Sequence, residues 1–390
     1  MIVLASILNP NCPSGVVTYY KLLQSDLEQA GHQVTLVTHD DTPLLVRRSM
    51  GGLARLMRLA GRPGEVLHNQ LDHAIKLYTA LRRIPAQSVE LVHAQDPIAG
   101  AMAKLAYPNV PVIITCHFND NPVAEIQAVE PVGAAGEARL ERWYRWLFGK
   151  IDQFVFVSQY AYQKSAHLLP PGHRYTVIHN TVRLAGNVTV TTTERPWRIT
   201  NVGFIEERKN QVYLIRLANR IKQLTSQPFE IVLIGDGPKR AEWEQLARQL
   251  SVQDIVRFVG RQPDPWRLVA DSDVYVHVAH NENCPYAIIE AMAVNVPAMA
   301  LPVGGIPELL PTSISHLSQS MDADAATILD VLTGKTRQLL LADQQAFFHH
   351  HLNPTASFNR LMAVYASART PESSTTNVSW QPVEVSIVNK

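Results

Sequence analysis

The stretch DSDVYVHVAHNENCPYAIIEAMAVNVPAMALPVGGIPE, residues 271–308, predicts the fold of this chain. It opens with a mostly apolar run that ends in polar residues, as a buried strand does, and a second apolar run from residue 298 leads into a Gly-Gly turn. Between them lies Pro285, which suits the first position of a helix because no backbone N–H is needed there. Strand, loop, helix, strand and glycine turn make a parallel α/β unit. Such sheets bind ligands at the carboxyl ends of their strands, so we expect a site in the loop before the helix.

Two glutamates, Glu282 and Glu290, stand with seven residues between them in this unit. If the helix starts at Pro285, Glu282 lies in the loop and Glu290 on the second turn, so both carboxylates can border one pocket. A helix N-terminus between them offers free N–H groups to a phosphate, and carboxylates accept hydrogen bonds from hydroxyls. A sugar nucleotide carries both groups, so the segment predicts a sugar-nucleotide site. The alternative is that both glutamates are solvated surface residues.

The length of the chain, 390 residues, exceeds one ordinary hydrophobic core and favours two domains. In each half, short apolar runs alternate with stretches of helical spacing, which is typical of a doubly wound sheet. The polar segment 188–196 lacks helical periodicity and is the expected hinge. Strands are expected at residues 2–7, 34–38, 91–93, 112–115, 154–157 and 175–178, and then at 199–202, 230–234, 256–258, 274–278 and 297–300.

The composition and the absence of certain motifs argue against several classes of protein. The formal net charge of +1 argues against a nucleic-acid-binding protein, since such domains usually carry a marked basic excess. Three cysteines without a Cys-x-x-Cys pair favour a reducing, cytoplasmic environment. The apolar residues 1–8 are too short for a signal peptide or a membrane span, and we expect a strand there. The chain contains neither a Gly-x-Gly-x-x-Gly after a strand nor a P-loop motif, so dehydrogenases and P-loop enzymes lose support.

The glutamate pair, the following Ala291-Met292-Ala293 and the segment 304–308 resemble the donor site of the retaining glycosyltransferases of family 4 (glycosyl transferases group 1). The resemblance extends over most of residues 1–368, with its motifs in the expected order. It implies the GT-B fold, an α/β architecture of two Rossmann-like, doubly wound domains that face a central cleft. The implied parts are an acceptor-side domain at 1–183, a sugar-nucleotide donor domain at 197–353, a helix at about 354–368 that crosses back onto the first domain, and a loose tail at 369–390.

The resemblance also implies the reaction. A sugar would pass from a nucleoside-diphosphate sugar to a hydroxyl of a sugar, lipid-linked or small-molecule acceptor, with retention, in glycan, polysaccharide or glycolipid assembly. No cofactor and no essential metal are expected, because a lysine and a helix N-terminus would hold the diphosphate. Two rivals stay open: a sugar-nucleotide epimerase of the same fold, and a sugar-nucleotide-binding subunit without turnover.

The catalytic residues implied by this resemblance are Lys209, Glu282 and His117. Lys209 would bind the donor diphosphate and offset the charge that develops on the leaving group. Glu282 would accept hydrogen bonds from hydroxyls of the donor sugar, and His117, at a strand end, would contact the transferred sugar. Taken alone, a strand-end histidine is more often a structural residue.

The implied donor-binding set adds glycine turns, one helix start and one glutamate. Glu290 would accept from the ribose hydroxyls, and the N–H groups at the helix start would address the phosphates. The full set is Gly15, Gly203, Lys209, Gly235, Gly237, Arg261, Glu282, Ala287, Ile288 and Glu290. Two positions depart from the family pattern: Phe204 replaces a second phosphate-binding arginine, for which Arg208 is a possible substitute, and Pro285 replaces a glycine beside the sugar.

A basic stretch stands out near the N-terminus. Between Pro43 and Gly64 there are five arginines, interleaved with leucines and without an acidic residue: Arg47, Arg48, Arg55, Arg58 and Arg62. Such a stretch fits either an amphipathic surface for peripheral contact with anionic lipid, or a solvated helix face with a packed apolar stripe. The sequence leaves both open.

Overall fold

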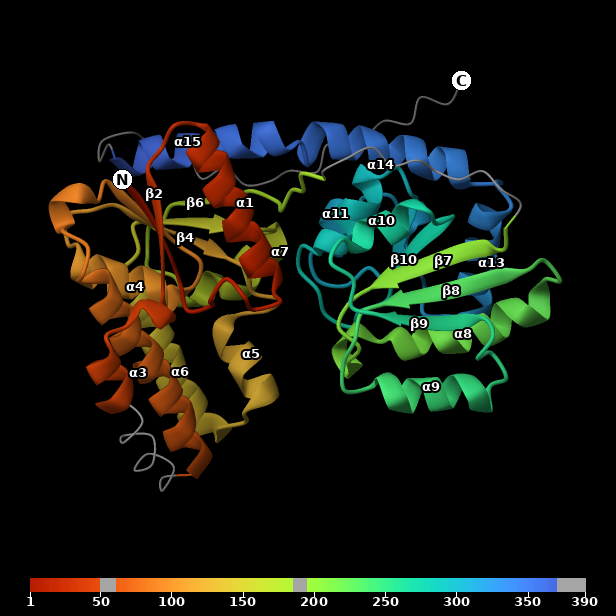
Figure 1. Cartoon of the computed structure of the whole chain (residues 1–390), viewed down its shortest axis with the longest axis horizontal. Helices are drawn as coiled ribbons and strands as arrows, with labels where there is room; N and C mark the ends of the chain where they lie inside the picture. The colour runs from red at the N-terminus through yellow and green to blue at the C-terminus, as the bar shows by residue number, and fades with distance from the viewer. Residues whose placement is uncertain (50–60, 185–194, 370–390) are drawn as a thin grey trace. The chain divides into compact units, whose positions relative to one another are not determined.

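The computed structural model describes residues 1–49, 61–184 and 195–369, and Figure 1 shows the course of the chain. The chain divides into two compact units. Unit 1 comprises Met1–His179 and the C-terminal helix from Ser357, and unit 2 comprises Asn180–Ala356. Most of the expected hinge at 188–196, and the expected tail from residue 370, lie outside the described residues.

Unit 1 is built on a six-stranded sheet in the order β2-β1-β3-β4-β5-β6, in which every neighbouring pair is parallel. Its strands are almost continuous apolar runs because helices cover both faces of the sheet. The strands are β1 (Ile2–Ser6), β2 (Val34–Thr38), β3 (Leu91–Ala94), β4 (Val112–Cys116), β5 (Gln153–Phe156) and β6 (Tyr175–Val177).

The C-terminal helix α15 (Pro354–Arg369) packs on one face of this sheet together with α1 (Gly15–Gln29) (Figure 1). Tyr365 of α15 is buried there, and its hydroxyl lies 2.7 Å from Nδ1 of His93. The crossing-back of the last helix onto the first domain is therefore confirmed. The other helices of unit 1 are α3 (Gly61–Leu81), α4 (Pro97–Ala106), α5 (Pro122–Val129), α6 (Gly133–Phe148) and α7 (Gln159–Ser165), with short 3-10 helices η1 (His39–Asp41), η2 (Ala86–Ser88) and η3 (Ala166–Leu168).

Unit 2 is built on a five-stranded parallel sheet in the order β11-β10-β7-β8-β9. Its strands are β7 (Trp197–Val202), β8 (Phe229–Ile234), β9 (Val256–Gly260), β10 (Val274–His277) and β11 (Ala298–Ala300). Its helices are α8 (Gln211–Leu224), α9 (Arg240–Gln249), α10 (Pro265–Ala270), α11 (Tyr286–Ala293), α12 (Ile306–Leu309), α13 (Met321–Leu332) and α14 (Arg337–His351), with 3-10 helices η4 (Glu207–Lys209) and η5 (Ser313–Ser315).

Each sheet has one point where the strand order reverses direction. In unit 1 this point lies between β1 and β3, and in unit 2 between β7 and β10. At such a switch point the loops after the two strands diverge to opposite faces of the sheet and leave a crevice beyond their carboxyl ends. The topology therefore marks one crevice in each unit as a place for a ligand.

The expected α/β fold with two doubly wound sheets is confirmed, and element boundaries differ by only a few residues. Pro285 is the N-cap of α11, so the helix itself starts at Tyr286, one residue later than expected. Among residues 1–49, 61–184 and 195–369, no helix has the length and apolar composition needed to cross a lipid bilayer.

Candidate functional site

At the switch point of unit 2, the loops after β7 and β10 bring an ammonium and a carboxylate together. Lys209 ends η4, which follows β7, and Glu282 lies in the loop that follows β10. Nζ of Lys209 is 2.5 Å from Oε2 of Glu282, and Nη1 of Arg208 is 3.4 Å from the same oxygen. Two of the three residues expected to be catalytic, Lys209 and Glu282, are thus neighbours, although they are 73 positions apart.

A histidine that sequence analysis missed lies against this pair. His277, the last residue of β10, is 1% exposed, and its Nε2 is 3.6 Å from Oε2 of Glu282. Its Nδ1 lies 2.9 Å from the hydroxyl of Tyr275. Both contacts suit the tautomer in which Tyr275 donates to Nδ1 and the ring presents Nε2–H to the carboxylate. A histidine at the end of an otherwise apolar strand was a signal in the sequence that could have marked it as a candidate, although not its partner.

The charges around Glu282 decide its protonation. Burial alone would raise the pKa of this carboxyl, but Lys209, His277 and Arg208 together bring the pKa well below its ordinary value. Burial lowers the pKa of His277, so the imidazole is neutral at physiological pH. A buried carboxylate is tolerated only when it is paired and hydrogen-bonded, and these neighbours supply both interactions. Glu282 is therefore a fixed anion and a weak base.

Glu290 lies on the second turn of α11 in a different environment. It is half-buried, and among the described residues no ion-pair partner approaches it. Burial, and secondarily the negative charge of Asp264, raise the pKa of Glu290 to about 7. Near neutral pH both the protonated and the ionised carboxyl are present, so this group can either donate or accept a hydrogen bond. Ribose hydroxyls also donate and accept, so such a carboxyl can bind them.

The first turn of α11 has unused donors. Pro285 caps the helix without a side-chain hydrogen bond, and the N–H of Ile289 donates to the carbonyl of Pro285 at 3.5 Å. The N–H groups of Ala287 and Ile288 precede that bond, and helix geometry gives them no acceptor within the helix. With the positive end of the helix dipole, they form a place for an anion.

The glycine turns around the site leave no room for a side chain, because the neighbouring backbone lies too close. A Cβ on Gly235 would lie 1.9 Å from the carbonyl oxygen of Gly203, and a Cβ on Gly304 would lie 1.8 Å from that of Glu282. The N–H of Gly305 donates to the Glu282 carbonyl at 3.1 Å, so the glycine turn after β11 braces the loop that carries the carboxylate. These glycines fix the site whether or not they also touch a ligand.

Three other residues of the expected donor-binding set, Gly237, Arg261 and Gly15, follow or begin other elements than those that carry Lys209 and Glu282. A Cβ on Gly237 would meet the carbonyl of Ile205 at 2.3 Å, so this glycine also has a packing role. Arg261 is exposed just beyond β9, and Gly15 is the first residue of α1, in unit 1. Phe204 is 48% exposed, whereas Nη1 of Arg208 lies 3.4 Å from Glu282, so Arg208 supplies a second cation beside this carboxylate.

His117 belongs to unit 1, where it follows β4. Its Nε2 lies 3.1 Å from Oε1 of Gln95, and its ring packs edge-on against Tyr19 with centroids 4.7 Å apart. Burial lowers the pKa of His117 to about 3, so the ring is neutral. It is a hydrogen-bonding group, and its low pKa makes it a poor proton acceptor.

Two family models match successive parts of the chain. Residues 13–185 match the model described as Glycosyltransferase Family 4, and residues 189–332 match Glycosyl transferases group 1. The chain belongs to this family of glycosyltransferases. The resemblance read from the glutamate pair and the glycine turn is thereby confirmed.

Individual relatives match shorter segments of this chain. N-acetyl-alpha-D-glucosaminyl L-malate synthase of Bacillus anthracis is 36% identical over 89 residues, which is 23% of each chain. The Vi polysaccharide biosynthesis protein VipC/TviE of Salmonella typhi is 34% identical over 99 residues, 24% of this chain and 17% of the relative. Each match thus spans a quarter or less of the relative's length.

Solved structures share the fold over nearly the whole chain. Sucrose-phosphate synthase of Thermosynechococcus elongatus superposes with a TM-score of 0.71 at 16% identity, covering 94% of this chain and 98% of its own. HepE of Anabaena, in complex with UDP and glucose, superposes with a TM-score of 0.67 at 16% identity, covering 94% and 100%. At this level of identity the likeness establishes the GT-B fold.

The arginine-rich stretch between Pro43 and Gly64 is described only in part. Arg48 and Arg62 are exposed, and Arg47 is partly buried, with Nη2 3.8 Å from Oδ1 of Asp40. Arg55 and Arg58 lie outside the described residues. Leu44 and Leu45 are exposed at 72% and 80%, so the described part does not pack its leucines inward. Contact with anionic lipid stays a prediction.

Proposed function

We propose that the protein is a retaining glycosyltransferase that moves a sugar from a nucleoside-diphosphate sugar to an acceptor hydroxyl. The observation that carries the proposal is the contact of Lys209 with Glu282 at the switch point of unit 2. That position favours a ligand, and the family membership supports sugar transfer as its chemistry. HepE, which shares the fold, was solved with UDP and glucose, so UDP-sugars are the first donors to test.

In this proposal Lys209 and the start of α11 hold the diphosphate. The ammonium of Lys209 and the N–H groups of Ala287 and Ile288 would stabilise the charge that develops as the nucleoside diphosphate departs. They are fixed before the reaction, so they need little reorganisation when that charge appears. No essential metal is proposed, because these groups would carry the charge of the leaving group.

The two glutamates would bind different parts of the donor. Glu282, an anion of low basicity, would accept hydrogen bonds from hydroxyls of the donor sugar. Glu290 would bind the ribose. His117, neutral and hydrogen-bonded to Gln95, would contact the transferred sugar through its other ring nitrogen. The protein's main contributions would be orientation, exclusion of water and stabilisation of the leaving group.

The proposed acceptor is a sugar, lipid-linked or small molecule, and the proposed context is glycan, polysaccharide or glycolipid assembly. The match to a protein of Vi polysaccharide biosynthesis supports that context. We propose a cytoplasmic protein, with peripheral membrane contact through the arginine-rich stretch as a separate hypothesis. Sedimentation with anionic vesicles at low salt, compared with neutral vesicles, tests that hypothesis, and equal sedimentation rejects it.

A panel of labelled UDP-, GDP- and ADP-sugars tests the function. We expect one nucleotide to raise the melting temperature, because a ligand that binds only the folded form stabilises it. We also expect slow donor hydrolysis that is lost in Glu282→Gln, and proton NMR of a transferred product should show the donor's anomeric configuration. Binding without hydrolysis or transfer would identify a non-catalytic subunit, and a changed sugar nucleotide without transfer would identify an epimerase. An inverted anomeric centre would reject retention.

A further inference from the structure

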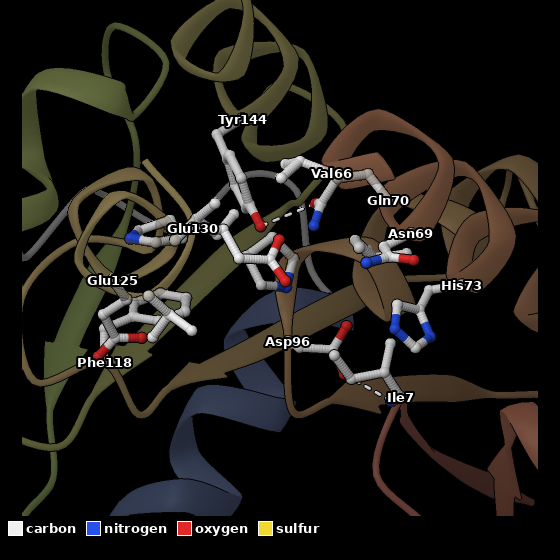
Figure 2. A pocket seen from close by; sticks show the side chains of 15 residues that line it. Ile7, Val66, Asn69, Gln70, His73, Asp96, Phe118, Glu125, Glu130 and Tyr144 are labelled. Atoms are coloured by element: carbon white, nitrogen blue, oxygen red, sulfur yellow. Dashed lines mark hydrogen bonds between the residues drawn. The ribbon is translucent and has the colours of Figure 1, made fainter. Parts of the chain in front are cut away.

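Unit 1 contains a cavity of about 370 Å³ at its own switch point. Ile7 follows β1, Asp96 follows β3 and Phe118 follows β4, and all three line the cavity. The N–H of Ile7 donates to Oδ2 of Asp96 at 2.8 Å and ties the two loops of the switch point together. Helices α3, α5 and α6 supply most of the remaining wall (Figure 2). The volume falls in the range of about 300–1,000 Å³ that is typical of small-molecule sites.

The charged part of the lining is acidic. Asp96, Glu125 and Glu130 all line the cavity, whereas none of the described lining residues is a lysine or an arginine. Asp96 is held in place as the N-cap of α4, where Oδ1 accepts from the N–H of Ala99, and Glu125 accepts from the N–H of Asn119 at 2.7 Å. Glu130 has no ion-pair or hydrogen-bond partner among the described residues. A phosphate or carboxylate in this cavity would meet like charges without a counter-ion.

Neutral donors complete the lining. Gln70 is 9% exposed, and its side-chain carbonyl accepts from the hydroxyl of Tyr144 at 3.0 Å. Its amide NH₂ has no acceptor among the described residues, so it is available to a ligand in the cavity that Gln70 lines. Nδ1 of His73 is likewise buried without a described partner, and burial lowers the pKa of this ring, which keeps it neutral. Figure 2 draws Gln70 and His73, both on α3, and Glu130, which follows α5, among the side chains that line the cavity.

Carboxylate acceptors beside amide and imidazole donors are the groups that bind a polyol, because each hydroxyl both donates and accepts. Apolar neighbours such as Ile98 and Ile126 can cover the C–H faces of a sugar ring. We propose that this cavity binds the acceptor, and that the acceptor is a sugar or polyol without an anionic group. The inference rests on the proposed function and extends it to a substrate class.

Ligand-observed NMR on the full chain tests the inference with two matched pairs of probes: glucose and glucose 1-phosphate, and myo-inositol and myo-inositol 1-phosphate. We expect at least one neutral probe to bind at least tenfold more tightly than its phosphate. Glu130→Lys places a cation in the cavity, so it should weaken the neutral probe and reduce the preference at least tenfold. Glu137→Lys, on an exposed position of α6, makes the same charge change and should leave the preference unaltered.

Two outcomes overturn the inference: equal or tighter binding of the phosphates by the unaltered protein, or no saturable binding of either neutral probe. If Glu130→Lys lowers the melting temperature, Gln70→Glu serves as the second variant, and it should weaken the phosphates further. Donor hydrolysis is measured in parallel. Transfer with release of nucleoside diphosphate that occurs only to sugar phosphates rejects the acceptor class and leaves the proposed function standing. Neutral binding that depends on Glu130, without any donor hydrolysis, rejects the function and leaves the cavity assignment standing.

Discussion

Glu282 and Glu290 lie in one short segment of unit 2, but their surroundings give them opposite properties. The loop places Glu282 beside Lys209, Arg208 and His277, and the pKa of its carboxyl is well below the ordinary value. The helix places Glu290 half-buried and away from cations, and its pKa rises to about 7. Although the two side chains are identical, Glu282 is an anion at all physiological pH values, whereas Glu290 titrates near neutral pH. They stand close together in the sequence, and neighbours from distant segments set their protonation states.

The largest effect on turnover is expected from removing the ammonium of Lys209, which pairs with Glu282. Lys209→Ala should lower turnover on the order of a hundredfold, because loss of one preorganised group at a developing charge costs about that much. Donor KM should change less than tenfold. Steady-state kinetics with the donor found in the panel measure both constants. Lys222→Ala, an exposed lysine on α8, is the control, and a Lys209→Ala variant with unchanged turnover would refute the role of Lys209.

Removing the second glutamate should affect binding more than turnover. Glu290→Ala should weaken nucleotide affinity about tenfold or more, because a hydrogen bond to a charged group contributes about 1.5–3 kcal/mol. Isothermal titration with the nucleoside diphosphate measures this affinity. Glu244→Ala on α9 removes a carboxylate whose ion-pair partner in the described part of the chain is Arg240, and it should leave the affinity unchanged. Equal affinity in the Glu290→Ala variant would remove this residue from the nucleotide site.

A smaller effect is expected at His277, which positions Glu282. His277→Leu keeps a similar volume but removes the ring whose Nε2 lies 3.6 Å from Glu282, and it should lower turnover up to about tenfold, because a polar contact of this kind contributes about 1 kcal/mol. Nucleotide affinity should stay the same, since the ring contacts the carboxylate and lies buried. His277→Gln should recover part of the turnover. A fall in nucleotide affinity with unchanged turnover would show that the ring does not act through Glu282.

The smallest effect is a pH dependence of stability that comes from Glu290. A folded-state pKa of about 7, above the ordinary value of 4.5, means that folding favours the protonated carboxyl. This stabilisation is complete below pH 4.5 and is lost as pH rises through 7. Glu290→Gln is always neutral, so its melting temperature relative to the unaltered protein should be a few degrees higher at pH 8 than at pH 5. Scanning calorimetry without ligand measures the difference, and a constant offset across this range contradicts the raised pKa.

Much of the fold could be read from the sequence because apolar periodicity is local. The strand expected at 34–38 is found at Val34–Thr38, and the helix expected at about 354–368 is found at Pro354–Arg369. The role of His277 could not be read in this way, because a histidine in a strand gives no sign of which side chain it faces. The cavity of unit 1 was also not foreseen, since its wall combines loop residues with helices far apart in the chain.

The sequence by itself determined the alternation of strands and helices, the glutamate pair and the family to which the chain belongs. Those features depend on residue types and spacings within short segments. Only the tertiary structure decided that Lys209 pairs with Glu282, that Glu290 has no ion-pair partner among the described residues, and that the charged lining of the unit 1 cavity is acidic. Charge states and cavities depend on burial and on distances between side chains from separate segments, and these exist only after the parallel strands have assembled into sheets.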